Sequence, residues 1–63
     1  MDYATQCNLG RDHAGQMLRE TARTGNLPKM VQTIREIAKE DTGFAVGFLF
    51  ALSDRAIQIN GGA

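Results

Sequence analysis

Apolar residues along this chain recur mainly at steps of three and four, the spacing that gathers side chains on one side of an α-helix. Stretches in which apolar and polar residues alternate, as in β-strands, are absent. The pattern predicts an all-α fold with helices over residues 3–24, 27–41 and 43–59. With 63 residues the chain makes one domain, placed at 1–60, followed by a flexible tail at 61–63.

The first predicted helix has an apolar stripe built largely from small side chains. Asp2 has a side chain suited to a helix N-cap, and Gly25 suits the left-handed residue that often follows a helix. The part from Arg11 to Thr24 is predicted helical, whereas residues 1–10 either extend this helix or stay disordered. The stripe consists of Tyr3, Cys7, Gly10, Ala14, Met17 and Thr21.

The second predicted helix has the clearest amphipathic pattern. Asn26 suits its N-cap, and Pro28 falls in its first turn, where a missing backbone N–H costs nothing. Gly43 offers a left-handed residue to end it. The residues predicted to face the core span an arc of about 120°. They are Leu27, Met30, Val31, Ile34, Ile37 and Ala38.

The third predicted helix has a very apolar surface, spread over an arc of about 200°. Two short helices cannot cover so wide an arc, whereas a second copy of the chain can, so the pattern predicts a homodimer or higher homo-oligomer. Gly47 and Ala51 lie four residues apart, and would permit either close helix approach between copies or space for an aromatic ring of the same chain. The predicted interface comprises Phe44, Val46, Phe48, Leu49, Phe50, Leu52 and Ile57.

The small size of the chain also favours assembly. A domain of this length buries only roughly 60% of its unfolded surface, and such domains usually need a disulfide, a metal or a partner subunit. Cys7 is the only cysteine, and together with His13 it falls short of the four ligands of a structural zinc site. Association with itself is the remaining source of stability, and we expect neither a metal nor a cofactor.

Charge and hydropathy bear on the partners and the cellular compartment that we expect for the protein. Seven basic and seven acidic residues give a net charge of zero, which argues against a main role in binding nucleic acid or an anionic membrane. The longest apolar run, from Phe44 to Leu52, is short against the about twenty residues of a membrane-spanning helix. A lone cysteine and an N-terminus without a signal-peptide pattern favour the cytoplasm.

Few residues carry the pattern of a chemical site. Asp12 and His13 are adjacent on a helix and diverge by about 100°, so they do not form a ready acid–base pair. Cys7 lies on the apolar stripe, where a cysteine acts as a small hydrophobe. Ser53 interrupts the apolar arc of the third helix and lacks a partner base. A cofactor-free enzyme built at a subunit interface around His13 or Asp54 is the third hypothesis for function.

Residues 18–37 also fit the rhythm of a helix-turn-helix motif, with a short turn that contains Gly25. In that hypothesis the exposed face of the recognition helix comprises Lys29, Gln32, Thr33 and Arg35. Glu36 and Glu40 on the same helix oppose DNA binding, as does the zero net charge. DNA binding is therefore the second hypothesis. The first is a non-enzymatic interaction or regulatory protein that binds itself, with another protein as a further partner.

Overall fold

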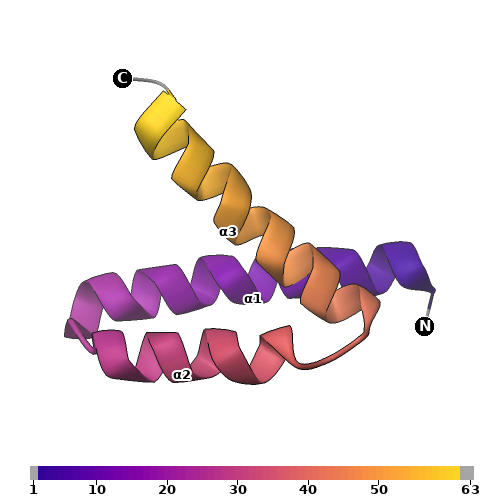
Figure 1. Cartoon of the computed structure of the whole chain (residues 1–63), viewed down its shortest axis with the longest axis horizontal. Coiled ribbons are helices and arrows are strands. Elements are labelled where there is room, and N and C mark those ends of the chain that lie inside the picture. Colours follow the sequence, from indigo (N-terminus) through magenta and orange to yellow (C-terminus); the bar gives the residue numbers. More distant parts are fainter. Residues whose placement is uncertain (1, 62–63) are drawn as a thin grey trace.

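Three helices make up the computed structural model, which describes residues 2–61 (Figure 1). They are α1 (Tyr3–Thr24), α2 (Leu27–Ala38) and α3 (Gly43–Gly61), and this range contains no strand. The all-helical prediction is confirmed. Helices α1 and α2 form an antiparallel hairpin, and α3 crosses α1 with its first half while its second half extends away from the hairpin. Of the predicted tail, residues 62 and 63 lie outside the described part.

Local capping explains where the first two helices begin. The Asp2 carboxylate accepts a hydrogen bond from the Thr5 backbone N–H at 2.7 Å, which caps α1 at its start. Residues 3–10, for which the sequence left two alternatives, are part of this helix. The Asn26 side-chain oxygen accepts one from the Lys29 N–H at 3.2 Å, which starts α2. Both predicted N-caps are confirmed.

Gly25 forms the turn between α1 and α2 in the left-handed conformation that the sequence predicted. Its φ is 72°, and its N–H donates to the Thr21 carbonyl at 2.7 Å. This bond satisfies one of the carbonyls left free at the end of α1. The turn therefore reverses the chain without a long loop.

Gly43 does not have the predicted role. Helix α2 ends at Ala38, three residues before the predicted end at residue 41, and Gly43 is the first residue of α3. Gly25 is the only residue with positive φ in the described range, so Gly43 provides no left-handed stop. The Thr42 hydroxyl oxygen instead accepts a hydrogen bond from the Ala45 N–H at 3.1 Å, which caps the start of α3.

Two glycines allow α1 and α3 to cross with their backbones in contact. A Cβ at Gly10 would overlap the Phe44 carbonyl oxygen and lie 2.8 Å from the Phe48 nitrogen. A Cβ at Gly47 would overlap the Cys7 carbonyl oxygen. Close approach at Gly47 is therefore made to α1 of the same chain.

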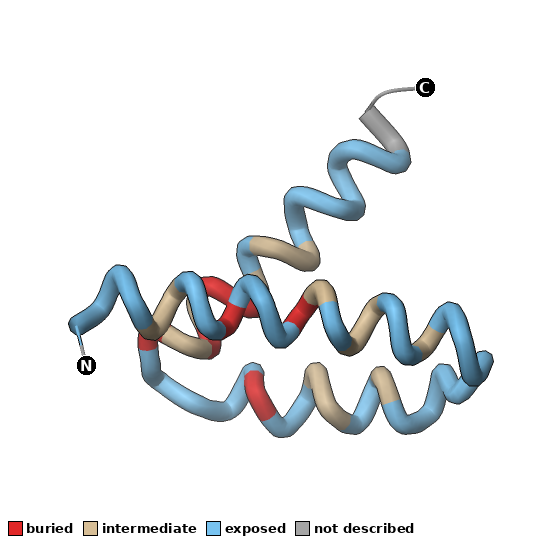
Figure 2. Tube along the Cα trace, turned by 180° about the vertical axis from the view of Figure 1, so that it is seen from behind, coloured by how far each residue is buried: buried red, intermediate tan, exposed pale blue. Residues whose placement is uncertain are grey.

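The hydrophobic core is small and lies at this crossing (Figure 2). Phe48 is fully enclosed there, and residues from all three helices surround it. The buried apolar residues are Ala14, Ile37, Ala45 and Phe48, with Met17, Ile34, Phe44, Leu49, Ala51 and Leu52 packed around them. So small a core gives modest stability to the single chain.

Helix α2 meets the core with only part of its predicted stripe. Ile37 is buried and Met30 and Ile34 are half-buried, but Leu27 and Val31 keep 58% and 41% of their surface exposed. Ala38 is exposed as well. The prediction was wrong for these last three residues, because α2 is rolled so that the side carrying Thr33 faces inward and the Leu27 edge faces outward.

Candidate interaction surface

The side of α3 that faces away from α1 is the most unusual surface of the molecule. Gly47 contacts Cys7, and Ala45 and Phe48 are buried, so these residues mark the side of α3 that packs against the hairpin. At about 100° per residue, the opposite side is formed by residues at the remaining helical positions. We call this surface the outward face of α3; it comprises Val46, Leu49, Phe50, Ser53 and Ile57.

Large apolar side chains on the outward face remain in contact with water. Phe50 keeps 61% of its surface exposed and Ile57 keeps 66%, while Val46 and Leu49 are half-buried. Every residue from Ser53 to Ile59 is exposed, because this part of α3 extends beyond the hairpin (Figure 2). Full burial of each large apolar side chain would contribute roughly 1.5–3 kcal/mol, so this face gains from being covered.

The structure separates the seven residues predicted to form an oligomer interface. Phe48 is fully buried within one chain and leaves no surface for a partner. Phe44 is half-buried beside the ring of His13, at 5.5 Å between ring centroids. Leu52 is half-buried and packs against the core. The remaining four, Val46, Leu49, Phe50 and Ile57, belong to the outward face.

His13 and Asp54, the residues of the enzyme hypothesis, lie in different grooves. His13 borders a cleft between α1 and α2, and its ring also lies 5.7 Å from that of Phe48. Asp54 lines a shallower groove between α1 and α3, next to Arg11 and Arg55. Within residues 2–61, no three His, Cys, Asp or Glu side chains gather as a metal site would require. The two residues do not share one site.

The residues proposed for DNA contact line two different grooves. Lys29 and Thr33 line the cleft between α1 and α2. Gln32 and Arg35 line a groove on the other side of α2, beside Leu27 and others. Antiparallel packing of α1 and α2 also differs from the steep crossing, about 90–120°, of a helix-turn-helix.

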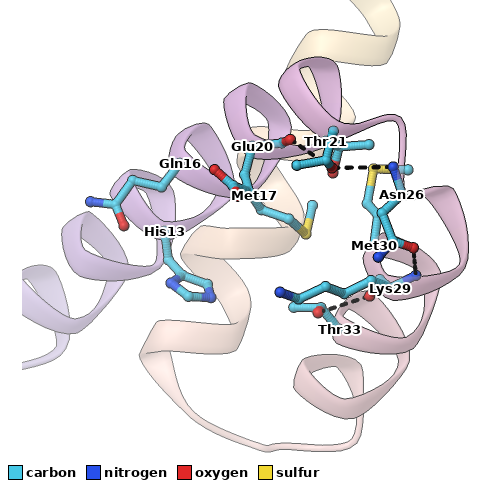
Figure 3. Close-up of a pocket in the computed structure, with 10 residues that line it drawn as sticks. His13, Gln16, Met17, Glu20, Thr21, Asn26, Lys29, Met30 and Thr33 are labelled. Atoms are coloured by element: carbon cyan, nitrogen blue, oxygen red, sulfur yellow. Dashed lines mark hydrogen bonds between the residues drawn. The ribbon is translucent and has the colours of Figure 1, made fainter.

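The cleft between α1 and α2 was not anticipated from the sequence (Figure 3). Its volume is about 350 Å³, and its half-buried lining is formed by Met17, Thr21, Met30 and Thr33. The helical pattern assigned Met17 and Met30 to core-facing stripes, which is where they lie. The spacing of these residues in the sequence does not predict that a cleft separates the two helices beside them.

One ion pair stands at the edge of this cleft. Arg23 Nη2 donates to Glu20 Oε1 at 2.5 Å, and Arg23 Nε donates to Glu20 Oε2 at 3.3 Å. The hydrogen bond and the positive charge of Arg23 lower the pKa of the Glu20 carboxyl. Glu20 is therefore ionised at neutral pH, and Arg23 balances its charge.

No protein-family model, curated protein or solved structure matches this chain. No helix within residues 2–61 combines the length and the apolar character needed to span a lipid bilayer.

Proposed function

We propose that this protein is a small helical interaction protein that works as a homo-oligomer, joined through the outward face of α3. The observation that carries the proposal is the exposure of Phe50 and Ile57 on a helix whose second half extends beyond the hairpin. Water-exposed aromatic and branched apolar side chains on one helix face are typical of association sites.

The order of residues along the outward face suits antiparallel pairing about a two-fold axis. If the axis passes between Phe50 and Ser53, each Phe50 lies opposite the small Ser53 of the other copy. The same register brings Val46 opposite Ile57. A bulky side chain then fills the space left by a small one, as in knobs-into-holes packing.

Antiparallel pairing also suits the shape of the chain. The bulk of each molecule lies at the first half of α3, and the second half extends away from it (Figure 1). In the antiparallel arrangement, each extended half lies along the first half of the partner's α3. Opposed helix dipoles add a favourable contribution.

Sedimentation velocity over concentrations from low micromolar to about 1 mM tests the proposal. We expect the mass to rise from 6.9 kDa toward twice that value as concentration increases. Phe50→Ser should hold the protein at the monomer mass. Leu27→Ser removes an equally exposed apolar side chain from α2 and should leave association unchanged.

A wild-type chain that stays folded and monomeric over this whole range contradicts the proposal. Equal loss of association in the Phe50→Ser and Leu27→Ser variants places the interface elsewhere. Circular dichroism of each variant checks that the helices persist, so that a change in mass reports association and not unfolding.

A further inference from the structure

The cleft between α1 and α2 has an apolar floor that can adapt to a ligand. Met17 from α1 and Met30 from α2 are half-buried and face each other across it (Figure 3). Methionine side chains are flexible and polarisable, so they fit the irregular shape of an aliphatic chain. With a volume of about 350 Å³, the cleft falls in the range of small-molecule sites.

One lysine places a positive charge over this floor. The Lys29 side chain reaches across the cleft from the first turn of α2, and the His13 ring points toward it from α1 (Figure 3). Among residues 2–61, Lys29 takes part in no ion pair. Glu20, the acid that lines the same cleft, forms its ion pair with Arg23, and the charge of Lys29 also acts on its carboxyl group. Because Lys29 makes no ion pair with Glu20, its ammonium can bind an anion.

Neutral polar groups lie beside the Lys29 ammonium. The Thr33 hydroxyl donates to the Lys29 carbonyl at 3.0 Å, and the Thr24 hydroxyl donates to the Glu20 carbonyl at 3.0 Å. These bonds fix the two hydroxyl groups against their own helices and leave the methionines as the principal apolar surface. A ligand for this cleft therefore needs one anionic end and one apolar end.

We propose that the cleft binds a small amphipathic carboxylate, with its aliphatic chain on Met17 and Met30 and its carboxylate at Lys29. A chain of about eight carbons fits a site of this size. The charge-assisted contact sets the orientation, and burial of the chain supplies most of the affinity. This site is separate from the outward face of α3 and does not depend on association.

Titration of the ¹⁵N-labelled protein with octanoate, kept below its micelle concentration, tests this inference by NMR. We expect saturable shifts in the backbone amides of the residues that line the cleft. Octylamine presents the same chain with a positive end, and it should bind about five-fold or more weakly because Lys29 repels it.

Two charge-neutralising variants, one in α2 and one at its C-cap, make a matched pair. Lys29→Gln should weaken octanoate binding about five-fold or more, whereas Lys39→Gln, which removes a charge paired with Glu36, should change it less than two-fold. Equal binding of octylamine, or an unchanged affinity in Lys29→Gln, overturns the proposal. Shifts centred on Phe50 and Ile57 overturn it as well, since they indicate adsorption to the outward face.

Discussion

Gly47 of α3 lies against Cys7 of α1 so closely that a methyl group at position 47 would overlap the Cys7 carbonyl oxygen. The contact is between two backbones, so neither side can move away without shifting a whole helix. Gly10 makes the reciprocal contact with Phe44 one turn further along α1. These two glycines set the distance between α1 and α3.

Gly47→Ala should lower the free energy of unfolding by roughly 1–3 kcal/mol, because overpacking outweighs the better helix propensity of alanine. Gly15→Ala is the matched control, since its Cβ would meet only the flexible end of Arg19, at 3.4 Å. That variant should gain up to about 1 kcal/mol. Urea denaturation followed by circular dichroism measures both. A Gly47→Ala protein as stable as Gly15→Ala would show that the helices cross elsewhere.

Gly25→Ala tests the turn between α1 and α2. The space around Gly25 is open, but its φ of 72° is a conformation that alanine adopts at a cost of roughly 1–2 kcal/mol. We expect a loss of unfolding free energy of that size. Gly25→Asn should lose less, because asparagine tolerates the left-handed conformation better. Similar stability of all three proteins would contradict the turn geometry.

Truncation of Phe48 should lower the stability of the fold, whereas truncation of Phe50 should mainly weaken association. Phe48→Ala removes a fully buried ring and should destabilise the fold by about 3–5 kcal/mol. Phe50→Ala removes a ring that is 61% exposed, and should change the stability of the monomer by less than about 1 kcal/mol while weakening association. Thermal melts at low concentration, together with sedimentation at high concentration, separate the two effects. An equal loss of stability in both variants would contradict the orientation of α3.

Disulfide cross-linking can test the register proposed for paired α3 helices. In a Cys7→Ala background, a mixture of Phe50→Cys and Ser53→Cys chains should form mixed dimers under mild oxidation. Ser53→Cys alone should cross-link poorly, because antiparallel pairing separates identical positions that lie away from the axis. Phe50→Cys alone should also cross-link poorly, because both copies of the pair then lack the Phe50 ring. Mass spectrometry identifies the products. Efficient cross-linking of each variant with itself, and little of the mixed product, would indicate parallel pairing.

The N-cap of α1 should respond to acid. Hydrogen bonds from Thr5 lower the pKa of the Asp2 carboxyl. Because the folded-state pKa is the lower one, the capping contribution is present above the unfolded value and is lost as pH falls through the folded value. Exchange of the Thr5 amide should therefore become less protected, relative to its intrinsic rate, in this acidic window. Asp2→Asn should keep the cap and remove its pH dependence. A wild-type protein without this change would contradict the cap.

Features set by neighbouring residues were predictable from the sequence. The residues that cap the helices, Asp2, Gly25 and Asn26, interact only with residues within about one turn of the helix. Their residue types therefore predict where the helices begin and end. Gly43 shows the limit of this reasoning. A glycine after a helix can serve a left-handed turn or a close tertiary contact, and the Gln6 side chain that packs against Gly43 lies far away in the sequence.

Features set by packing between helices were harder to predict. Phe48 and Phe50 are both apolar residues of one broad arc, and only the crossing at Gly10 and Gly47 decides which of them is buried. The cleft has the same origin. Met17 and Met30 each belong to a predicted core stripe, but periodicity does not give the distance between the two helices that carry them.

Because α3 crosses α1 near its own beginning, the long free part of the helix determines how far apart two hairpins would stand in a pair. In the register proposed above, Gly47 lies opposite Ala56 of the other copy, so the two α1–α3 crossings would stand nine residues, about 14 Å, apart along the paired helices. Each hairpin carries one cleft. The assembly would then be bivalent, and a target presenting two ligands at matching separation would bind with an avidity that neither copy has alone.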